Sequence, residues 1–154
     1  IGFKSISFDK SLCKEPVKAS DGKISVLLVE PNKYPKMIKI DDTLEAMQEV
    51  VGGDIEEYMP FEDEVAIICN EEGKITGMAP NRAVYEENSR EMLDIICGKF
   101  FIVYAPFEAE RFQSLPPDLA EKYREKFKYP ERFMRVNNEI VAVPFKPVRA
   151  DKER

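Results

Sequence analysis

The chain of 154 residues contains no histidine. Histidine is the commonest general base, the commonest metal ligand and the usual activator of serine and cysteine nucleophiles. Most hydrolase mechanisms are therefore excluded. The three cysteines, Cys13, Cys69 and Cys97, form no C-x-x-C pair. The sequence accordingly predicts reduced thiols, no structural zinc site and no cofactor.

The chain also lacks a long hydrophobic run. No segment approaches the roughly 18 consecutive apolar residues needed to span a bilayer, and the first ten residues lack the apolar core of a signal peptide. We therefore expect a cytoplasmic protein that makes no membrane contact. With 44% hydrophobic and 34% charged residues, the composition is that of a globular domain with one core.

Basic residues are scarce in the middle of the chain. The formal net charge is −6, yet residues 41–98 contain only 3 basic residues against 16 acidic ones. Six acids without a base lie between positions 54 and 64, namely Asp54, Glu56, Glu57, Glu62, Asp63 and Glu64. This acidic block either is a solvated face neutralised by the basic ends of the chain, or projects a negative field toward a basic partner protein. It is not expected to bind nucleic acid directly, because phosphate contacts require Lys and Arg.

Apolar runs predict the main strands. They cover residues 24–29, 36–40, 65–69 and 99–105. The first run is short, continuous and rich in branched side chains, which is typical of a central strand covered on both faces.

Helical patterns alternate with these runs. Asp42 followed by Glu45 is a capping-box pattern, and apolar residues at helical spacing then predict a helix over 42–51 that ends at two glycines. Similar spacing predicts helices over 89–97 and 116–129. A hairpin is expected over 133–145, turning at two adjacent asparagines.

The predicted fold class is α+β. We expect a single mixed β-sheet with two or three packed helices, followed by a C-terminal helix and hairpin. Residues 1–22 are assigned to an N-terminal extension and residues 23–105 to the core domain. Residues 106–154 form an aromatic and basic extension that is expected to pack on the core.

The polar segment after the strand 65–69 carries the remaining candidate contact residues, which are Asn70, Glu71, Glu72, Asn81 and Arg82. The first four residues of this segment fit a type I turn with a glycine bulge, so we expect a positive φ at Gly73 and a partner strand over 74–78. Arg82, isolated among acids, is expected either in a buried ion pair or displayed for a partner. The acid pair Glu71 and Glu72 could serve a carboxylate-dependent hydrolase, although a solvated turn is a poor place to tune a pKa.

Four stretches together resemble a known family: "ISVLLVEPNKYPKMIKI", "TLEAMQEVVGG", "AIICNEEGKITGMAPNRAV" and "DIICGKFFIVYA". In this order they resemble an uncharacterised domain family carried by phages, plasmids and conjugative elements of Gram-positive bacteria, and the resemblance covers residues 23–105. It implies a small intracellular α+β module of mobile elements, often found near antirestriction-type proteins. It carries over no enzyme activity and no catalytic residues.

The sequence thus favours a non-enzymatic protein-interaction module of a mobile genetic element, with an unknown and basic partner protein. One alternative is an antirestriction-like acidic DNA mimic, in which the acids of residues 41–98 imitate phosphates. The other alternative is the carboxylate-dependent hydrolase. The oligomeric state is left open.

Overall fold

The computed structural model describes residues 3–5 and 22–147. Its centre is a sheet of six strands, β1 (Phe3–Ser5), β2 (Lys23–Val29), β3 (Lys36–Asp41), β4 (Ile55–Tyr58), β5 (Val65–Asn70) and β8 (Phe100–Tyr104). The spatial order is β1-β4-β5-β8-β2-β3, and every neighbouring pair is antiparallel. The α+β class is therefore confirmed, whereas the expected single mixed sheet is wrong: the main sheet is antiparallel and two smaller sheets accompany it.

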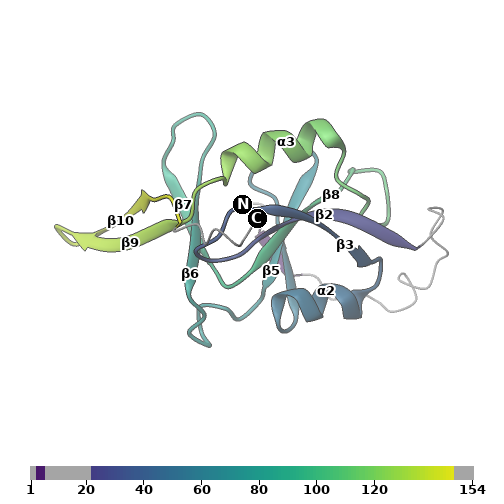
Figure 1. The fold of residues 1–154 in the computed structure, drawn as a ribbon, viewed down its shortest axis with the longest axis horizontal. Helices are drawn as coiled ribbons and strands as arrows, with labels where there is room; N and C mark the ends of the chain where they lie inside the picture. The colour runs from purple at the N-terminus through teal and green to yellow at the C-terminus, as the bar shows by residue number, and fades with distance from the viewer. Residues whose placement is uncertain (1–2, 6–21, 148–154) are drawn as a thin grey trace.

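One helix covers each face of the main sheet (Figure 1). Helix α2 (Leu44–Val51) matches the predicted helix but begins later, because Thr43 is the N-cap and its hydroxyl accepts a hydrogen bond from the Ala46 amide. Asp42, the predicted cap, is instead buried and bound by the guanidinium of Arg111, 2.7 Å away. Helix α3 (Pro117–Lys126) lies within the predicted range 116–129. None of the helices in the described part of the chain is long and apolar enough to cross a membrane.

The central strands bury both of their faces. Leu27 of β2, Ile67 of β5 and Ile102 of β8 belong to the apolar cluster under α3. Their neighbours Val26, Ile68 and Phe101 belong to the cluster under α2, since successive strand residues point to opposite faces. The predicted strands 24–29, 36–40, 65–69 and 99–105 are all confirmed, and the continuous run of β2 is covered on both faces as expected.

Strands β6 (Pro80–Tyr85) and β7 (Met92–Cys97) form a two-stranded ribbon. The helix expected over 89–97 is therefore wrong. The apolar residues of this segment fit a helical period, but Ile95 and Ile96 are β-branched and the ladder with β6 decides the outcome. Val84 and Ile96 turn inward and join the cluster under α3.

The hairpin expected at residues 70–78 is also wrong. After β5 the chain makes a series of turns and then continues into β6, which pairs with β7. Gly73 is not among the residues with positive φ; a Cβ there would lie 2.8 Å from the Cys97 carbonyl oxygen. Glycine at position 73 is required for close backbone contact, so a larger side chain would be disfavoured by that clash and not by left-handed strain.

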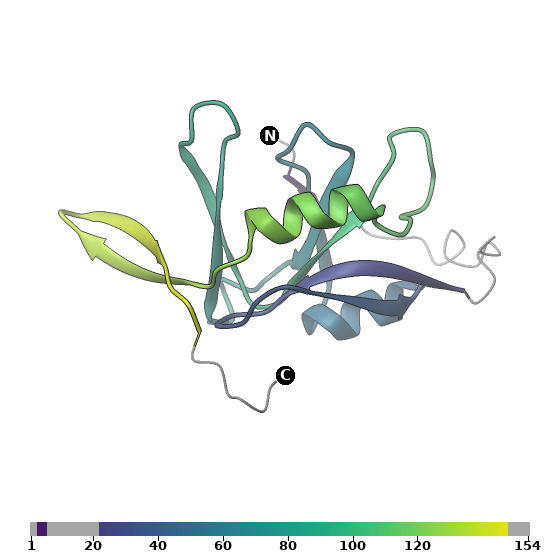
Figure 2. The ribbon, with the colours of Figure 1, turned by 45° about the horizontal axis from the view of Figure 1, so that its top comes forward.

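The C-terminal hairpin is confirmed. Strands β9 (Glu131–Val136) and β10 (Glu139–Pro144) turn at Asn137 and Asn138, whose φ angles are 52° and 67°. The hairpin projects away from the sheet and helices, next to the β6–β7 ribbon (Figures 1 and 2). Helix α3, by contrast, packs on the main sheet, where Tyr123 and Phe127 are buried.

Candidate functional site

The pair Asn81–Arg82 is a structural junction. Arg82 is fully buried, and its guanidinium donates to the carbonyl oxygens of Phe127 (3.0 Å) and Lys33 (2.8 Å). It also donates to the Asn81 side-chain oxygen (2.8 Å), while the Asn81 amide donates to the carbonyls of Val29 and Gly98. The described residues contain no salt bridge to Arg82, so both expectations, an ion pair and display for a partner, are wrong. Burial lowers the pKa of Arg82 to about 10, which leaves it charged at neutral pH.

The acidic block does not form one exposed face. Glu56 and Glu57 lie in β4, which sits between β1 and β5, and both side chains are buried. Asp63 accepts hydrogen bonds from Lys122 (2.7 Å) and from the Tyr123 hydroxyl (2.8 Å). The others are more exposed: Asp54 accepts from Gln48, Glu64 accepts from the Phe107 amide, and Glu62 lies at the surface. The block thus serves several structural roles and is not a single negative surface.

Glu56 borders a small cavity, here called the Glu56 cavity, of about 270 Å³. It lies between the ends of β4 and β5, the 70–75 loop and β7. Its polar lining residues are Glu56, Asn70, Glu71, Lys74 and Asp94, and the thiols of Cys69 and Cys97 also border it. The Glu56 side chain is only 7% exposed, and its carboxylate has no hydrogen bond or ion pair among the described residues. Burial, reinforced by the negative charges of Glu71 and Asp94, raises the pKa of Glu56 from 4.5 to about 7.

Two other charged groups of this cavity bind each other, and its two thiols are not activated. Lys74 forms an ion pair with Asp94, which also accepts from the Ile95 amide at 2.7 Å. Burial raises the pKa of Cys69 to about 12 and raises that of Cys97, so neither thiol is an activated nucleophile. The arrangement can therefore hold a proton near neutral pH or face a cationic group, and its thiols are not activated as nucleophiles.

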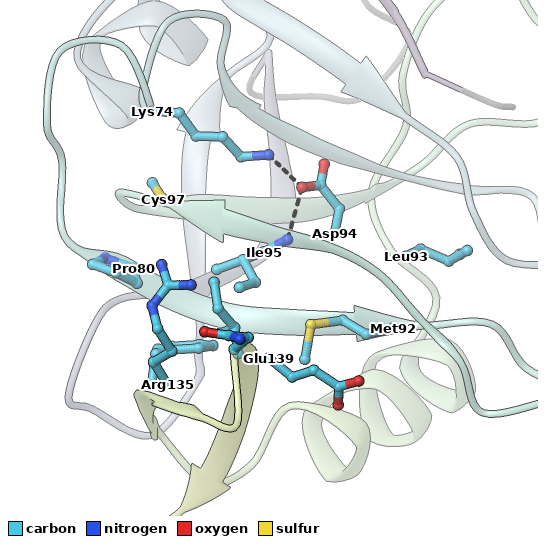
Figure 3. A pocket seen from close by; sticks show the side chains of 12 residues that line it. Lys74, Pro80, Met92, Leu93, Asp94, Ile95, Cys97, Arg135 and Glu139 are labelled. Carbon is cyan, nitrogen blue, oxygen red and sulfur yellow. Dashed lines mark hydrogen bonds and ion pairs between the residues drawn. The ribbon is translucent and has the colours of Figure 1, made fainter.

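A larger cavity of about 760 Å³, here called the groove, lies between β7 and the hairpin (Figure 3). Its apolar lining consists of Pro80, Met92, Leu93, Ile95, Cys97, Phe133 and Ile140. Its polar lining consists of Lys74, Asp94, Arg135, Asn138 and Glu139. The groove and the Glu56 cavity share Lys74, Asp94, Ile95 and Cys97, so the two spaces meet at β7.

The structure separates the predicted contact residues instead of bringing them together at one site. Glu56, Asn70 and Glu71 border the Glu56 cavity, whereas Glu72 is exposed on the loop, and Asn81 and Arg82 are buried elsewhere. Asn70 also shapes the loop, because its side chain donates to the Val51 carbonyl and accepts from the Glu72 amide.

Sequence reasoning missed Asp94 and the apolar wall of β7, because residues 89–97 were assigned to a helix. The one available signal was Asp94 itself, an acid within the apolar run 92–97. Across the described residues there is no group of three or more Cys, Asp or Glu side chains placed to hold a metal ion.

The comparison with protein families gives one match. Residues 24–128 match the model of a family described as a domain of unknown function, DUF3846. The match includes β7 and Glu56 and extends through α3, beyond the expected 23–105. No curated protein and no solved structure matches the chain. Because the family model covers more than half of its residues, the chain belongs to the DUF3846 family, whose function is unknown.

Proposed function

We propose that this chain is a non-enzymatic protein-interaction module, and that the groove between β7 and the β9–β10 hairpin takes an apolar peptide segment of a partner protein. The observation that carries the proposal is the hairpin itself. A two-stranded hairpin is only marginally stable in water on its own, and this one projects from the body (Figure 1). It carries apolar side chains on both faces.

The register of the hairpin separates these two faces. Phe133 lies opposite Ala142, and Arg135 lies opposite Ile140, on the face that lines the groove. The other face carries Met134, Val136, Val141 and Val143, which are each between 37% and 47% exposed. Exposed apolar groups gathered on one element typically mark an interaction surface.

The groove has the dimensions and lining of a binding site. Its volume lies in the roughly 300–1,000 Å³ range of ligand pockets, and most of its lining residues are apolar. Leu93 on β7 and Ile140 on β10 are both 46% exposed, so an apolar segment between them would remove both side chains from water. Charged side chains of both signs, Lys74, Asp94, Arg135 and Glu139, could satisfy polar groups of the bound segment.

The setting of this module is part of the proposal. The resemblance of residues 23–105 to a family of phages, plasmids and conjugative elements supports a role in a mobile genetic element of Gram-positive bacteria. A cytoplasmic location accords with the free thiols at Cys69 and Cys97.

The two alternatives receive less support from the geometry. An acidic DNA mimic needs a contiguous exposed array of carboxylates, whereas Glu56 and Glu57 are buried and Asp63 is bound by Lys122. The carboxylate-dependent hydrolase assigned catalysis to Glu71 and Glu72, which both lie on the exposed loop. Both hypotheses stay untested.

The proposal is tested by selecting binders from a random library of displayed twelve-residue peptides and measuring their affinity by fluorescence anisotropy. The groove variants Leu93→Asp and Ile140→Asp should weaken the selected peptides at least tenfold, because each places a charge in the apolar contact. The matched control is Phe107→Asp, since Phe107 is 72% exposed and borders neither cavity. Failure to recover any peptide that depends on Leu93 and Ile140 would refute the proposal.

A further inference from the structure

The position of Glu56 within the sheet explains why its carboxyl group meets the cavity. In β4, Glu56 pairs with Cys69 of β5, and Tyr58 lies two residues further along the same face. Cys69 and Tyr58 belong to the apolar cluster that Ile96 of β7 also joins. Glu56 therefore points to the side of the sheet that β7 covers, where the chain could have placed another apolar residue.

The carboxylate of Glu56 lacks the compensation that buried charges normally have. A buried ionised group is costly unless it is paired or hydrogen-bonded. Glu56 has neither among the described residues, although 93% of its surface is buried and it borders the cavity. Among the described lining residues the one ammonium is that of Lys74, and Asp94 engages it. Within the described part of the chain, the cavity thus has on its wall an acid without a hydrogen bond or an ion pair.

We propose that the Glu56 cavity binds an alkylammonium or guanidinium group, and that the segment in the groove carries this group as a lysine or arginine side chain. The second half of this inference rests on the proposed function. The two cavities share Lys74, Asp94, Ile95 and Cys97, so they lie side by side at β7, and on this proposal a long basic side chain anchored in the groove extends past β7 to Glu56. A volume of about 270 Å³ is sufficient for the end of such a side chain.

The chemistry of the lining selects against other ligands. In the described lining, an anion would meet three acids, Glu56, Glu71 and Asp94, against the single ammonium of Lys74. Methylene groups of a basic side chain would contact Ile75, Ile95 and Ile96, which supply the apolar part of the lining. A neutral hydrogen-bond acceptor would require Glu56 to stay protonated. A ligand of that kind would raise the apparent pKa of Glu56, which is the competing outcome of the first experiment.

The groups that face Glu56 determine how binding depends on pH. They are Cys69 on β5, Glu71 and Lys74 on the loop, and Asp94 and Cys97 on β7. Among these, the acids raise the pKa of Glu56 and Lys74 lowers it. A bound cation adds a second positive charge, so it should favour the ionised carboxylate and release a proton. Affinity should consequently rise with pH through neutrality.

The first experiment uses n-butylammonium chloride as the probe, since it reproduces the end of a lysine side chain. The carboxyl carbon of Glu56 is followed by ¹³C NMR as a function of pH, and it is assigned by its loss in Glu56→Gln. The apparent pKa of Glu56 should fall saturably by at least about half a unit, which corresponds to a roughly threefold preference for the ionised form. Sodium chloride at equal ionic strength is the control. An unchanged pKa, or a rise, would overturn the inference.

The second experiment separates this inference from the proposed function. In peptides selected for the groove, replacing the basic residue by norleucine should cost at least tenfold in Kd with the wild-type chain and less than twofold with Glu56→Gln. Groove peptides without a basic residue, or without this coupling, would refute the peptide half and leave the proposed function intact. A response to butylammonium without any groove peptide would support the cation site and refute the proposed function.

Discussion

Two of the buried charged side chains, Arg82 and Glu56, have opposite surroundings. Arg82 is fully buried, and its guanidinium donates to the distant carbonyls of Phe127 and Lys33 and to the side-chain oxygen of the neighbouring Asn81. Glu56 is nearly as buried, but its carboxylate has no such partner among the described residues and borders a cavity. A buried charge that the chain itself satisfies is part of the architecture. A buried charge left unsatisfied beside empty space is where a ligand can add binding energy.

Replacing Arg82 should produce the largest effect. Arg82→Lys keeps the charge but cannot reach the carbonyls of Phe127 and Lys33 together with Asn81, so it should lower the free energy of unfolding by about 3 kcal/mol or more. Urea denaturation followed by circular dichroism measures the change. Arg135→Lys on the exposed hairpin is the control, with an expected change within about 0.5 kcal/mol. A loss below about 1 kcal/mol for Arg82→Lys would mean that the Arg82 junction is not structural.

Replacing Glu56 should instead stabilise the fold above neutral pH. The pKa of Glu56 is raised from 4.5 to about 7, so between these values the folded chain binds more protons than the unfolded chain. Stability should therefore fall as pH rises from about 4.5 through 7, by an amount on the order of 2 kcal/mol. Glu56→Gln should remove this pH-dependent loss of stability, so the variant should have a higher free energy of unfolding than the wild type at pH 8. The measurement is the wild-type minus variant difference in unfolding free energy across pH 4.5–8, and a flat difference would contradict the assignment.

Replacing Asp63 should change the free energy of unfolding least, and the pH dependence of that change should have the opposite sign to that of Glu56. Hydrogen bonding to Lys122, together with that from Tyr123, lowers the pKa of the Asp63 carboxyl. Its contribution is therefore present at neutral pH and is lost as pH falls through the lowered pKa. Because the pair is partly exposed, Asp63→Asn should cost only about 0.5–1 kcal/mol at pH 7. A cost above about 2 kcal/mol in urea denaturation would place Asp63 with Arg82 as a structural charge.

Local patterns were enough to predict part of the fold. The runs of β2, β5 and β8 are short, continuous and β-branched or aromatic, and only a strand covered on both faces suits them. The turn at Asn137 and Asn138 follows from the tolerance of asparagine for positive φ.

Long-range contacts explain what sequence reasoning missed. Residues 92–97 fit both a helical and an alternating pattern, and pairing with β6 decides between them. Glu56 was included among the contact residues as an exposed acid, yet its position between β1 and β5 buries it. Asp94 was missed together with β7. The candidate site depends on β4, which carries Glu56, and on β7, which carries Asp94, so its residues were only partly predictable.

The strand order of the main sheet also constrains the synthesis of the chain. Strand β8 lies between β5 and β2, although β2 precedes it by about seventy residues, and closing such a loop costs roughly 4 kcal/mol of chain entropy. Before residue 104 leaves the ribosome, the β2–β3 pair and the β4–β5 pair each expose an unpaired edge in the nascent chain. Such edges are templates for wrong pairing between chains. Pairing of β8 with both β5 and β2 therefore joins the two halves of the sheet and covers these edges.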